Sequence, residues 1–575
     1  METAPKTIFR RFEEVVKLFP KNNAIGYKVN GHFKVTSYKR LYDKINRYVT
    51  SLKGLGIREG TRVAIFSKNR PEWVILDLAL NKIGAISVPI HTTLSPKLIK
   101  YILNDSGAEY IAIGDLYSKF QAIEKEVAVK KIITFNQIPW KEDLIFFKDL
   151  FKAEPDAAEP ADFEVCTIIY TSGTTGNPKG VMLTNQNFLE NIKAAIQYVP
   201  YKQRDVFLSI MPLSHVLERT GGYYAPLFFG AAIYFAESPK TLAEDIKLVK
   251  PTAIVSVPRI FEKVFDKIMD KVRASSDFKQ KLFYRSLKIS REYIIAQEAK
   301  QEKIFRKILF WAADRFILKK IRHNLGGRLK FSISGGASLN PSIAKFFEAI
   351  GIKILEGYGL TETSPIIAVN PIADFRFGTV GKIIPGIEVK IADDNEILVK
   401  GSNVMKGYYN NESFTRECFT TEGFLKTGDL GHLDHDGYLT IIGRKKEMLV
   451  TSTGKNVNPE SLENTIAESK YISQVMIYGE KQKYLSALVV PDFEELKKYA
   501  RENNWQLELF ELLKYQPVID LIKSEIDKRL KDFPDNEQIG KFNLLDREFS
   551  EEREEMTPSL KLRRNKILEN YKHLI

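Results

Sequence analysis

Residues 170–181 read Tyr170-Thr-Ser-Gly-Thr-Thr-Gly-Asn-Pro-Lys-Gly-Val181, with four aliphatic hydroxyls, three glycines and one lysine. An apolar run typical of a β-strand precedes them, and helical spacing of apolar residues predicts a helix from about Asn185. Glycines let a backbone approach a ligand closely, and backbone N–H groups, hydroxyls and an ammonium are what a polyphosphate needs. Such a density of small polar residues is hard to explain as a surface spacer. The stretch therefore predicts a polyphosphate-binding loop, but not a Walker A loop, because Gly180 stands where a Ser or Thr would bind magnesium.

The chain around this loop alternates between short apolar runs and segments with helical spacing. Such alternation predicts parallel sheets covered by helices on both faces. The expected strands are 62–66, 85–90, 110–113, 132–135, 165–170, 231–235, 253–257 and 329–334, with helices over 71–82 and 94–104 and further helix starts at Asn340-Pro341 and Asn458-Pro459.

The sequence pattern changes after residue 387, where the expected strands become shorter and glycines separate them. We expect a small β-rich unit over about 387–442, then an antiparallel pair at 475–478 and 485–490. The predicted fold class is therefore an α/β large N-terminal domain, with two parallel-type sheets plus the small β-rich unit, and a smaller α+β C-terminal domain. We place the large domain at 1–445 and the small one at 446–575.

Composition limits the kind of protein. The length of 575 residues predicts about three to five packed units. Apolar residues at 44% and charged ones at 27% exclude a wholly disordered chain. Two cysteines exclude a disulfide scaffold and a Cys-rich zinc array, and favour a reducing compartment. The first twenty residues lack a signal-peptide core, and no apolar run approaches the length of a membrane span. We expect a cytoplasmic protein, soluble or bound peripherally to a membrane.

The positive charge is concentrated in one segment. Residues 271–330 hold 17 Lys and Arg against five Asp and Glu, a net +12 of the chain's +14. They belong to a long basic helical stretch, about 262–325, inserted between two expected strands. The stretch is either a solvated helical face or a site for an anionic partner. No nucleic-acid module accompanies it; an acidic membrane surface, at the inner face of the membrane, and a phosphorylated ligand both stay open, and the membrane surface is our hypothesis.

Four further short motifs carry polar chemistry. Each alone is also compatible with an ordinary turn or cap. Beside the first loop, the Glu356–Pro365 segment suggests a nucleotide–magnesium site, because hard oxygen ligands suit Mg²⁺. The others are Thr427-Gly428-Asp429, Gly443-Arg-Lys-Lys-Glu447 and Thr557-Pro-Ser-Leu-Lys561.

These motifs, in this order from about Thr36 to Ile567, resemble the AMP-forming acyl-CoA synthetases of the adenylate-forming enzyme superfamily. Residues 212–219, 257–263 and the basic insertion look most like long-chain fatty acyl-CoA synthetases. The resemblance implies a fatty acid–CoA ligase using ATP, Mg²⁺ and CoA, in which a carboxylate attacks the α-phosphate of ATP and CoA then displaces AMP. It also implies a mobile C-terminal domain. Two alternatives stay open: loading of an acyl carrier protein, and a non-enzymatic lipid-binding relic. Oligomeric state and acyl chain length do not follow from the sequence.

Residue roles follow from the resemblance, motif by motif. The loop residues resemble the grip on the β- and γ-phosphates: Thr171, Ser172, Gly173, Thr174, Thr175, Gly176 and Lys179. Nucleotide contacts are implied for Gly335, Gly336 and Ala337 at adenine, Tyr358 and Gly359 against its ring, Thr361 at the α-phosphate, and Asp429 and Arg444 at the ribose. Glu362 resembles the magnesium ligand, with Thr171. Lys561 resembles the catalytic lysine, Lys446 the hinge residue and Gly454 the glycine of the thioester-forming pose.

Two positions need separate weighing. Leu560 stands where other branches of the superfamily carry glycine before the catalytic lysine. His215, in an apolar loop, is either a hydrogen-bonded structural residue or, as the resemblance implies, part of the acyl-entry region. No His or Cys cluster has zinc spacing.

Overall fold

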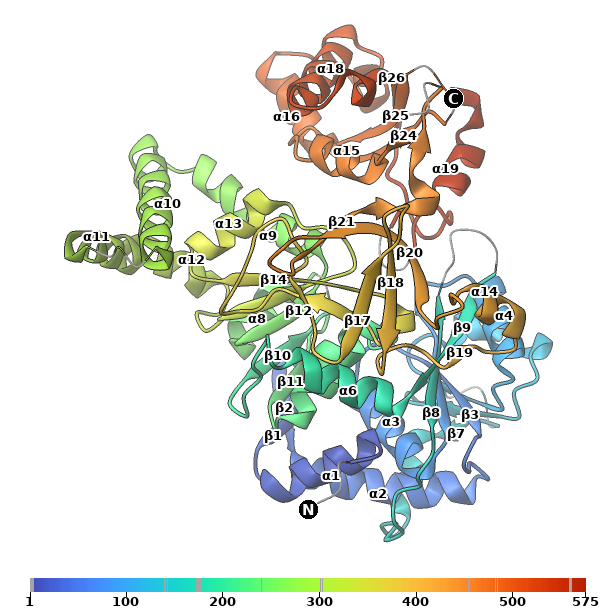
Figure 1. Cartoon of the computed structure of the whole chain (residues 1–575). Helices are drawn as coiled ribbons and strands as arrows, with labels where there is room; N and C mark the ends of the chain where they lie inside the picture. Colours follow the sequence, from blue (N-terminus) through green and yellow to red (C-terminus); the bar gives the residue numbers. More distant parts are fainter. Residues whose placement is uncertain are drawn as a thin grey trace. The chain divides into compact units, whose positions relative to one another are not determined.

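The computed structural model of the chain describes residues 5–575 except 139, 140, 142, 172–176, 239, 300, 302, 453–455, 481, 483 and 558–560. Its contacts divide into two compact units (Figure 1). Unit 1 comprises Met1–Lys390, Val399–Leu425 and Leu433–Thr440, and unit 2 comprises Ile391–Leu398, Lys426–His432 and Ile441–Ile575.

The first sheet of unit 1 has nine strands, and most neighbours run parallel. Their order is β16 (Lys382–Ile383), β15 (Ile366–Val369), β14 (Lys353–Gly359), β13 (Phe331–Ser334), β12 (Ala253–Ser256), β10 (Val206–Ser209), β11 (Ala232–Phe235), β1 (Asn23–Val29) and β2 (His32–Ser37). Apolar side chains of α8 (Leu242–Val249), α9 (Pro258–Arg273) and α13 (Pro341–Ala349) pack on it. The β1–β2 hairpin is an addition that the sequence analysis did not anticipate.

The second sheet of unit 1 has eight strands. Their order is β19 (Gly407–Tyr408), β9 (Lys179–Thr184), β8 (Val165–Thr171), β4 (Ile86–Pro89), β3 (Arg62–Phe66), β5 (Tyr110–Ile113), β6 (Lys131–Thr134) and β7 (Ile145–Phe146). Helix α3 (Pro71–Ile83) is buried from Trp73 onward, in one core with α1 (Ile8–Leu18), α2 (Tyr38–Gly54) and residues of both sheets. Helices α4 (Pro96–Ser106) and α5 (Tyr117–Gln121) pack with a separate core. The expected α/β architecture with two parallel-type sheets is confirmed.

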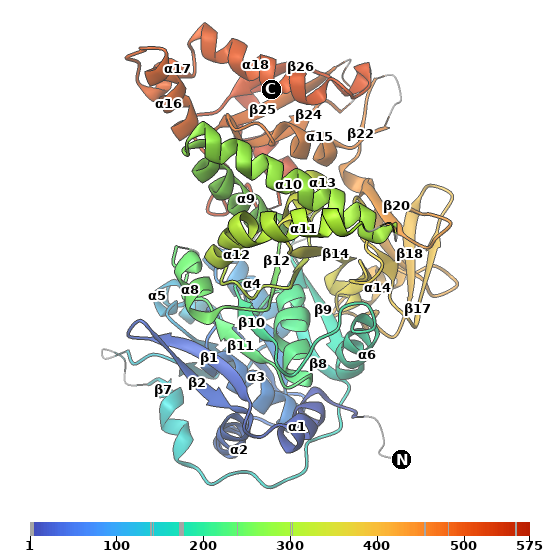
Figure 2. The same ribbon diagram turned by 90° about the vertical axis from the view of Figure 1, so that its left-hand side faces the viewer.

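The basic insertion lies between two neighbouring strands of the nine-stranded sheet. After β12 the chain forms α9, α10 (Asp277–Glu298), α11 (Ile304–Ala313), the π-helical turn η4 (Asp314–Leu318) and α12 (Lys319–Asn324), and then enters β13. Figure 2 shows α10 and α11 in front of the sheet strands of unit 1. Helices α6 (Asn185–Ala195) and α7 (Ala225–Phe228) and the π-helical segment η3 (Glu218–Tyr224) complete the main helices of this unit.

Unit 2 contains the three-stranded sheet β24 (Ile472–Tyr478), β25 (Leu485–Pro491) and β26 (Ile539–Leu544). Its first two strands are antiparallel, as predicted. The helices of this unit are α15 (Pro459–Ile466), α16 (Phe493–Glu502), α17 (Leu509–Leu512), α18 (Gln516–Leu530) and α19 (Arg564–Asn570), and β22 (Leu449–Val450) pairs with β23 (Asn456–Val457). The chain thus ends in a smaller α+β unit, as the predicted fold class requires.

The glycine-punctuated segment forms a four-stranded sheet. Its order is β17 (Ile387–Ile391), β18 (Glu396–Gly401), β20 (Leu425–Leu433) and β21 (Leu439–Arg444). The short helix α14 (Glu412–Glu417) follows β19. The residues of this sheet are divided between the two compact units. The sequence pattern could not indicate this division. No helix among the described residues is long and apolar enough to cross a bilayer.

Candidate functional site

The polyphosphate motif lies on a β-hairpin. Thr171 ends β8 and faces Lys179, which begins the antiparallel strand β9. Strand β9 then leads into α6, whose cap is a reciprocal pair between Thr184 and Asn187. The sequence analysis placed the helix start correctly at Asn185 but did not anticipate a strand between the loop and the helix. Five predicted phosphate ligands lie outside the described residues: Ser172, Gly173, Thr174, Thr175 and Gly176.

Tyr408 connects the lysine of this hairpin to Glu362. The Tyr408 hydroxyl donates a 2.8 Å hydrogen bond to Oε1 of Glu362. The Lys179 ammonium lies 6.0 Å from the Tyr408 ring centroid and 3.3 Å from that of Phe414. Burial and the charge of Glu362 raise the pKa of Tyr408, so its hydroxyl stays a donor. The structure thus gathers a predicted phosphate ligand and a predicted magnesium ligand around one tyrosine.

Backbone pairing fixes that tyrosine. Tyr408 pairs with Val181 of β9, and Met405 N–H donates to the carbonyl oxygen of Glu362 at 2.8 Å. Glu362 lies on the short 3₁₀ turn η5 (Thr361–Thr363), which begins with the predicted α-phosphate contact Thr361. Tyr408 was missed by the sequence analysis, since nothing in a Gly-Tyr dipeptide remote from the motifs indicates the contact.

The predicted adenine-contacting residues end two adjacent parallel strands. Gly335 follows β13, and Tyr358 lies on β14 opposite Ala368 of β15. A Cβ on Gly335 would lie 3.3 Å from Leu217 and 3.5 Å from the Gly357 carbonyl oxygen, so the turn and the Glu-Gly-Tyr segment lie close together. Gly336, with a φ of 86°, and Ala337 are exposed beyond it.

Only glycine fits at position 359, because a side chain there would clash with the backbone. A Cβ there would lie 1.7 Å from the carbonyl oxygen of Pro365, a distance that real atoms cannot adopt. The same carbonyl accepts a hydrogen bond from Leu360 N–H. Gly359 therefore permits the tight turn that carries Thr361 and Glu362 directly after Tyr358.

Glu356 is a buried carboxyl beneath the predicted adenine turn. It is 6% exposed, and its Oε2 accepts a 3.3 Å hydrogen bond from Leu339 N–H. Its Oε1 has no hydrogen-bond partner among the described residues. Burial raises the pKa of Glu356 to about 7. The sequence analysis included this residue in a motif without a role, because its burial depends on the neighbouring strands.

His215 lies beside a second histidine in unit 1. The ring centroids of His215 and His91 are 6.0 Å apart, and the Ser214 hydroxyl lies 3.2 Å from Nδ1 of His91. Burial, with a smaller contribution from His215, lowers the pKa of His91 to about 3, so His91 is neutral. His91 has no motif signal in the sequence.

Unit 2 gathers three of the predicted residues. Asp429 on β20 is buried and pairs with Arg444 at the end of β21, with 3.0 Å between Oδ1 and Nε. Lys561 lies in a turn in which its N–H donates to the Thr557 hydroxyl at 3.0 Å. Burial lowers the pKa of Lys561, and the positive charge of Arg444 lowers it further, against the carboxylates of Glu460, Asp429 and Glu447. The predicted ribose ligand and the predicted catalytic lysine therefore share one electrostatic environment.

The predicted hinge lies on a 3₁₀ turn, η6 (Lys445–Glu447). Lys446 is exposed, whereas the neighbouring Lys445 pairs with Asp394 and, at 2.9 Å, with Glu396. The turn is thus anchored through the lysine before the predicted hinge residue. Gly454 lies outside the described residues.

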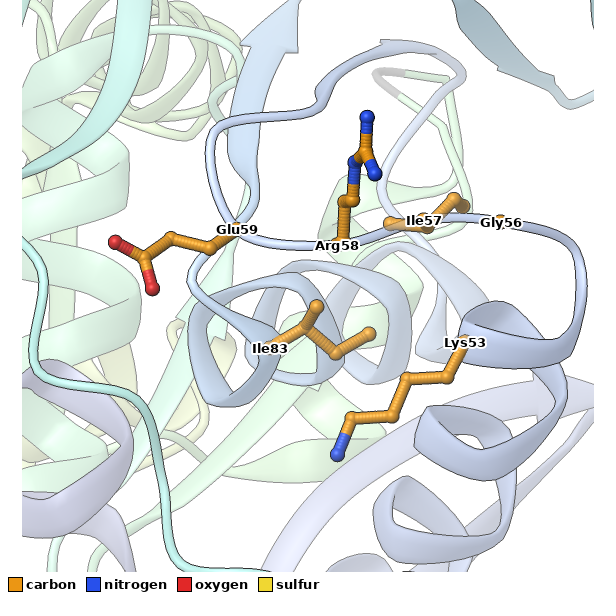
Figure 3. A pocket seen from close by; sticks show the side chains of 6 residues that line it. All are labelled: Lys53, Gly56, Ile57, Arg58, Glu59 and Ile83. Atoms are coloured by element: carbon orange, nitrogen blue, oxygen red, sulfur yellow. The ribbon is translucent and has the colours of Figure 1, made fainter.

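A shallow cavity of about 370 Å³ lies elsewhere in unit 1. Figure 3 shows its lining, which comprises Lys53, Gly56, Ile57, Arg58, Glu59 and Ile83. Five of these residues precede β3 and Ile83 precedes β4, whereas Thr171 ends β8. Because β3, β4 and β8 run parallel, the cavity lies at the amino edge of the sheet and the phosphate hairpin at the carboxyl edge. Ligands of α/β sheets bind at the carboxyl edge, so this cavity is not the candidate site.

Comparison with known families settles what kind of chain this is. The family model described as AMP-binding enzyme matches residues 12–409, and the model of the AMP-binding enzyme C-terminal domain matches residues 446–575. The chain belongs to the AMP-binding enzyme family.

Individual relatives agree with this family. A long-chain-fatty-acid–CoA ligase, FadD15 of Mycobacterium bovis, is 34% identical over 92% of this chain and 90% of its own. A chloroplastic long-chain-fatty-acid–[acyl-carrier-protein] ligase of Arabidopsis thaliana, AEE15, is 30% identical over 94% of this chain and 82% of its own. The crystal structure of the adenylation domain of a carboxylate reductase from Mycobacterium chelonae superposes with a TM-score of 0.81 at 22% identity, covering all of this chain and 91% of that one. That structural likeness shows the fold.

Proposed function

We propose that the chain is an AMP-forming long-chain fatty acid–CoA ligase. The observation that carries the proposal is the grouping of Lys179 and Glu362 around Tyr408, in a member of the AMP-binding enzyme family. The 34% identity to a long-chain-fatty-acid–CoA ligase over most of both chains supports the substrate class.

The first reaction joins a fatty acid to ATP. A carboxylate oxygen forms a bond to the α-phosphorus, the bond from that phosphorus to the bridging oxygen breaks, and pyrophosphate leaves with the electron pair. Little covalent help from the protein is needed, because both reactants are anions that must be positioned and neutralised. Lys179 would hold the terminal phosphates, Tyr358 and the Gly335–Ala337 turn the adenine, and Asp429 the ribose. Lys561 would neutralise charge growing at the α-phosphate.

Mg²⁺ fits the described residues as a metal held largely by the nucleotide. No group of three His, Cys, Asp or Glu residues that could hold a metal occurs in the described part of the chain. Mg²⁺ is commonly bound by one or two carboxylates plus substrate phosphates. Glu362 suits this role, since Tyr408 occupies one carboxylate oxygen and orients the other. Thr171 would assist. When bound, the ion supplies positive charge at the phosphates.

The second reaction transfers the acyl group from AMP to a thiol. The CoA sulfur attacks the acyl carbon, a thioester bond forms, and the bond to the AMP oxygen breaks. We propose that the C-terminal domain turns about Lys446 between the two reactions, so that Gly454 serves the thioester-forming step and Lys561 the adenylate-forming step. Support for a hinge at this point comes from the C-terminal family model, which begins at residue 446.

An acyl carrier protein is the alternative acceptor. The Arabidopsis relative named for that activity is 30% identical, against 34% for the CoA ligase. We favour CoA for this reason. We further propose that the enzyme acts in the cytoplasm, where the two free cysteines, Cys166 and Cys418, stay reduced. We also propose that it attaches peripherally to a membrane and has no nucleic-acid partner.

A substrate panel tests the proposal. Purified protein is given ATP, Mg²⁺ and either palmitate, benzoate or acetate, with CoA or a carrier protein, and products are identified by mass spectrometry. We expect palmitoyl-CoA and one AMP per thioester. If the thioester forms only on the carrier protein, the acceptor is a carrier protein and not CoA. If activity occurs only with benzoate or acetate, the proposed long-chain substrate class is wrong.

A further inference from the structure

The outer surface of α11 carries large apolar side chains that cover nothing within unit 1. Ile304 is 74% exposed, Phe305 67%, Ile308 57% and Trp311 60%. Large exposed apolar patches mark surfaces that meet a partner or a membrane, whereas scattered single residues do not. In α11 the exposed apolar residues make up much of one short helix.

Helical geometry places these side chains on one side. At about 100° per residue, Ile304, Ile308 and Trp311 fall within about 60° of one another, and Phe305 extends the arc to about 120°. Part of the opposite side of the helix packs on the protein. Phe310 stacks on Tyr293 of α10 with 4.4 Å between ring centroids, and Ala313 is buried. The apolar arc is therefore the side that α11 turns away from its own support.

Positive charge borders the apolar arc. Lys307 is exposed next to the arc at its Trp311 edge, Arg306 is exposed on the opposite side of the helix, and Lys303 and Arg315 are exposed at the two ends. Helix α10 adds further exposed cations, among them Lys281, Arg285 and Lys288. The segment carries most of the excess charge of the chain. Figure 1 shows α10 and α11 at one margin of unit 1.

We infer that α11 is an interfacial helix that docks unit 1 on an acidic lipid surface. Its apolar arc enters the boundary between headgroups and acyl chains, while Lys307 and the α10 cations lie among the anionic headgroups. A protein partner would need its own acidic, apolar groove, whereas a bilayer offers both features everywhere. The proposed ligase activity supplies the benefit, because long-chain fatty acids partition into membranes, but the docking itself needs no nucleotide or acyl group.

Vesicle co-sedimentation of the full chain tests this inference. We use phosphatidylcholine vesicles with and without phosphatidylglycerol, with neither ATP nor fatty acid present. We expect binding to the acidic vesicles that weakens as salt is raised, and much weaker binding to the neutral ones. A double variant, Ile308→Ser with Trp311→Ser, should bind about tenfold or more weakly, because two anchors are lost. Lys307→Gln should weaken binding about fivefold.

Matched controls come from unit 2. Phe510→Ser removes an apolar side chain that is similarly exposed, and Lys528→Gln removes an exposed cation. Both should bind like the unmodified chain. Thermal unfolding of every variant checks that a loss of binding is not a loss of fold. Brominated lipid should quench the fluorescence of Trp311, and Trp311→Phe should remove that quenching.

The outcomes separate the alternatives. Equal binding to neutral and acidic vesicles, or no binding to either, overturns the inference. Self-association that the Ile308→Ser, Trp311→Ser variant abolishes, without vesicle binding, assigns the arc to a second copy of the chain and also overturns it. AMP release with detergent-dispersed fatty acid reports the proposed function separately, and we expect the docking variants to keep it.

Discussion

Two cation sites in this chain are built on opposite principles. Arg219 in η3 is 1% exposed and fully engaged: it contacts Asp77, and it donates to the Tyr224, Thr167 and Ser87 hydroxyls at 2.8–3.0 Å. Burial alone would lower the pKa of Arg219, but Asp77 raises it above its ordinary value. Lys561 is only half-buried, and burial and Arg444 lower its pKa.

This contrast separates structural charges from charges that are available to a ligand. A charge enclosed with a complete set of partners serves the fold, since any ligand would have to displace those partners. A cation held near another cation stores electrostatic free energy that an arriving anion can release. Arg219 and Lys561 are therefore expected to fail in different ways when they are replaced.

The largest expected effect is on the buried pair. Arg219→Leu leaves the Asp77 carboxylate buried without its cation, which should cost about 3–5 kcal/mol of unfolding free energy. Urea denaturation measures this. The double variant Arg219→Leu with Asp77→Leu should recover part of the loss, because the uncompensated charge is gone. A stable, active Arg219→Leu single variant would remove the distinction drawn between the two cations.

Lys561→Ala should leave the fold intact and slow adenylate formation. Loss of one positioned charge should cost about 3–4 kcal/mol of transition-state stabilisation, or about 10²–10³ in rate. Exchange of pyrophosphate into ATP measures the first reaction. Attack of CoA on supplied acyl-adenylate measures the second, which should be largely retained. Lys566→Ala on α19 is the matched control. Equal failure of both reactions in a folded protein would show that Lys561 has another role.

Glu356 tests the cost of a buried carboxyl with an incomplete partner set. Burial raises its pKa from 4.5 to about 7, so the folded state holds a proton that the unfolded state releases. Its contribution to stability is greatest below pH 4.5 and falls by about 3 kcal/mol as the pH rises to about 7. Glu356→Gln should therefore be more stable than the unmodified chain at pH 8 and similar to it at pH 4.5.

Denaturation at several pH values measures this difference. Glu218 is also buried, and burial raises its pKa to about 8, so both proteins keep a pH dependence from that residue. Only the difference between the two curves reports Glu356. Glu502→Gln, at an exposed position, should leave the curve unchanged. Parallel curves for Glu356→Gln and the unmodified chain would contradict the burial argument.

The smallest expected effect is at Tyr408. Tyr408→Phe removes one hydrogen bond to a charged carboxylate, and such bonds contribute about 1.5–3 kcal/mol. Because Glu362 is then no longer oriented, we expect binding of ATP with Mg²⁺ to weaken by about tenfold or more. Calorimetry measures it, with the adjacent Tyr409→Phe as control. Unchanged nucleotide affinity would show that Tyr408 does not contribute to the nucleotide site.

The sequence predicts the layers of this fold better than its edges. Alternation of apolar runs and helical spacing placed β3, β5 and α3 closely, because period and capping are local properties. Strand β9 was missed, since it is defined by antiparallel pairing with β8 across the motif, which local residue spacing does not indicate. The division of the 387–442 segment between two units was also missed, because contacts and not composition decide it.

The same limit applies to the site. Lys179, Glu362, Asp429 and Lys561 are identifiable because their motifs are contiguous in sequence. Tyr408 and His91 are not, since Tyr408 joins the site through strand pairing with β9 and His91 through a ring contact with His215, both across long sequence separations. Glu356 stands inside a motif, yet its protonation follows from burial, which only the packed structure supplies.

The central claim is that this chain activates a fatty acid by forming an acyl-adenylate. Its most direct test is AMP release by the purified full chain with ATP, Mg²⁺, CoA and palmitate. We expect AMP and palmitoyl-CoA in equal amounts, and none of either when palmitate is omitted. Hydrolysis of ATP to ADP, or no AMP with any acid offered, would contradict it.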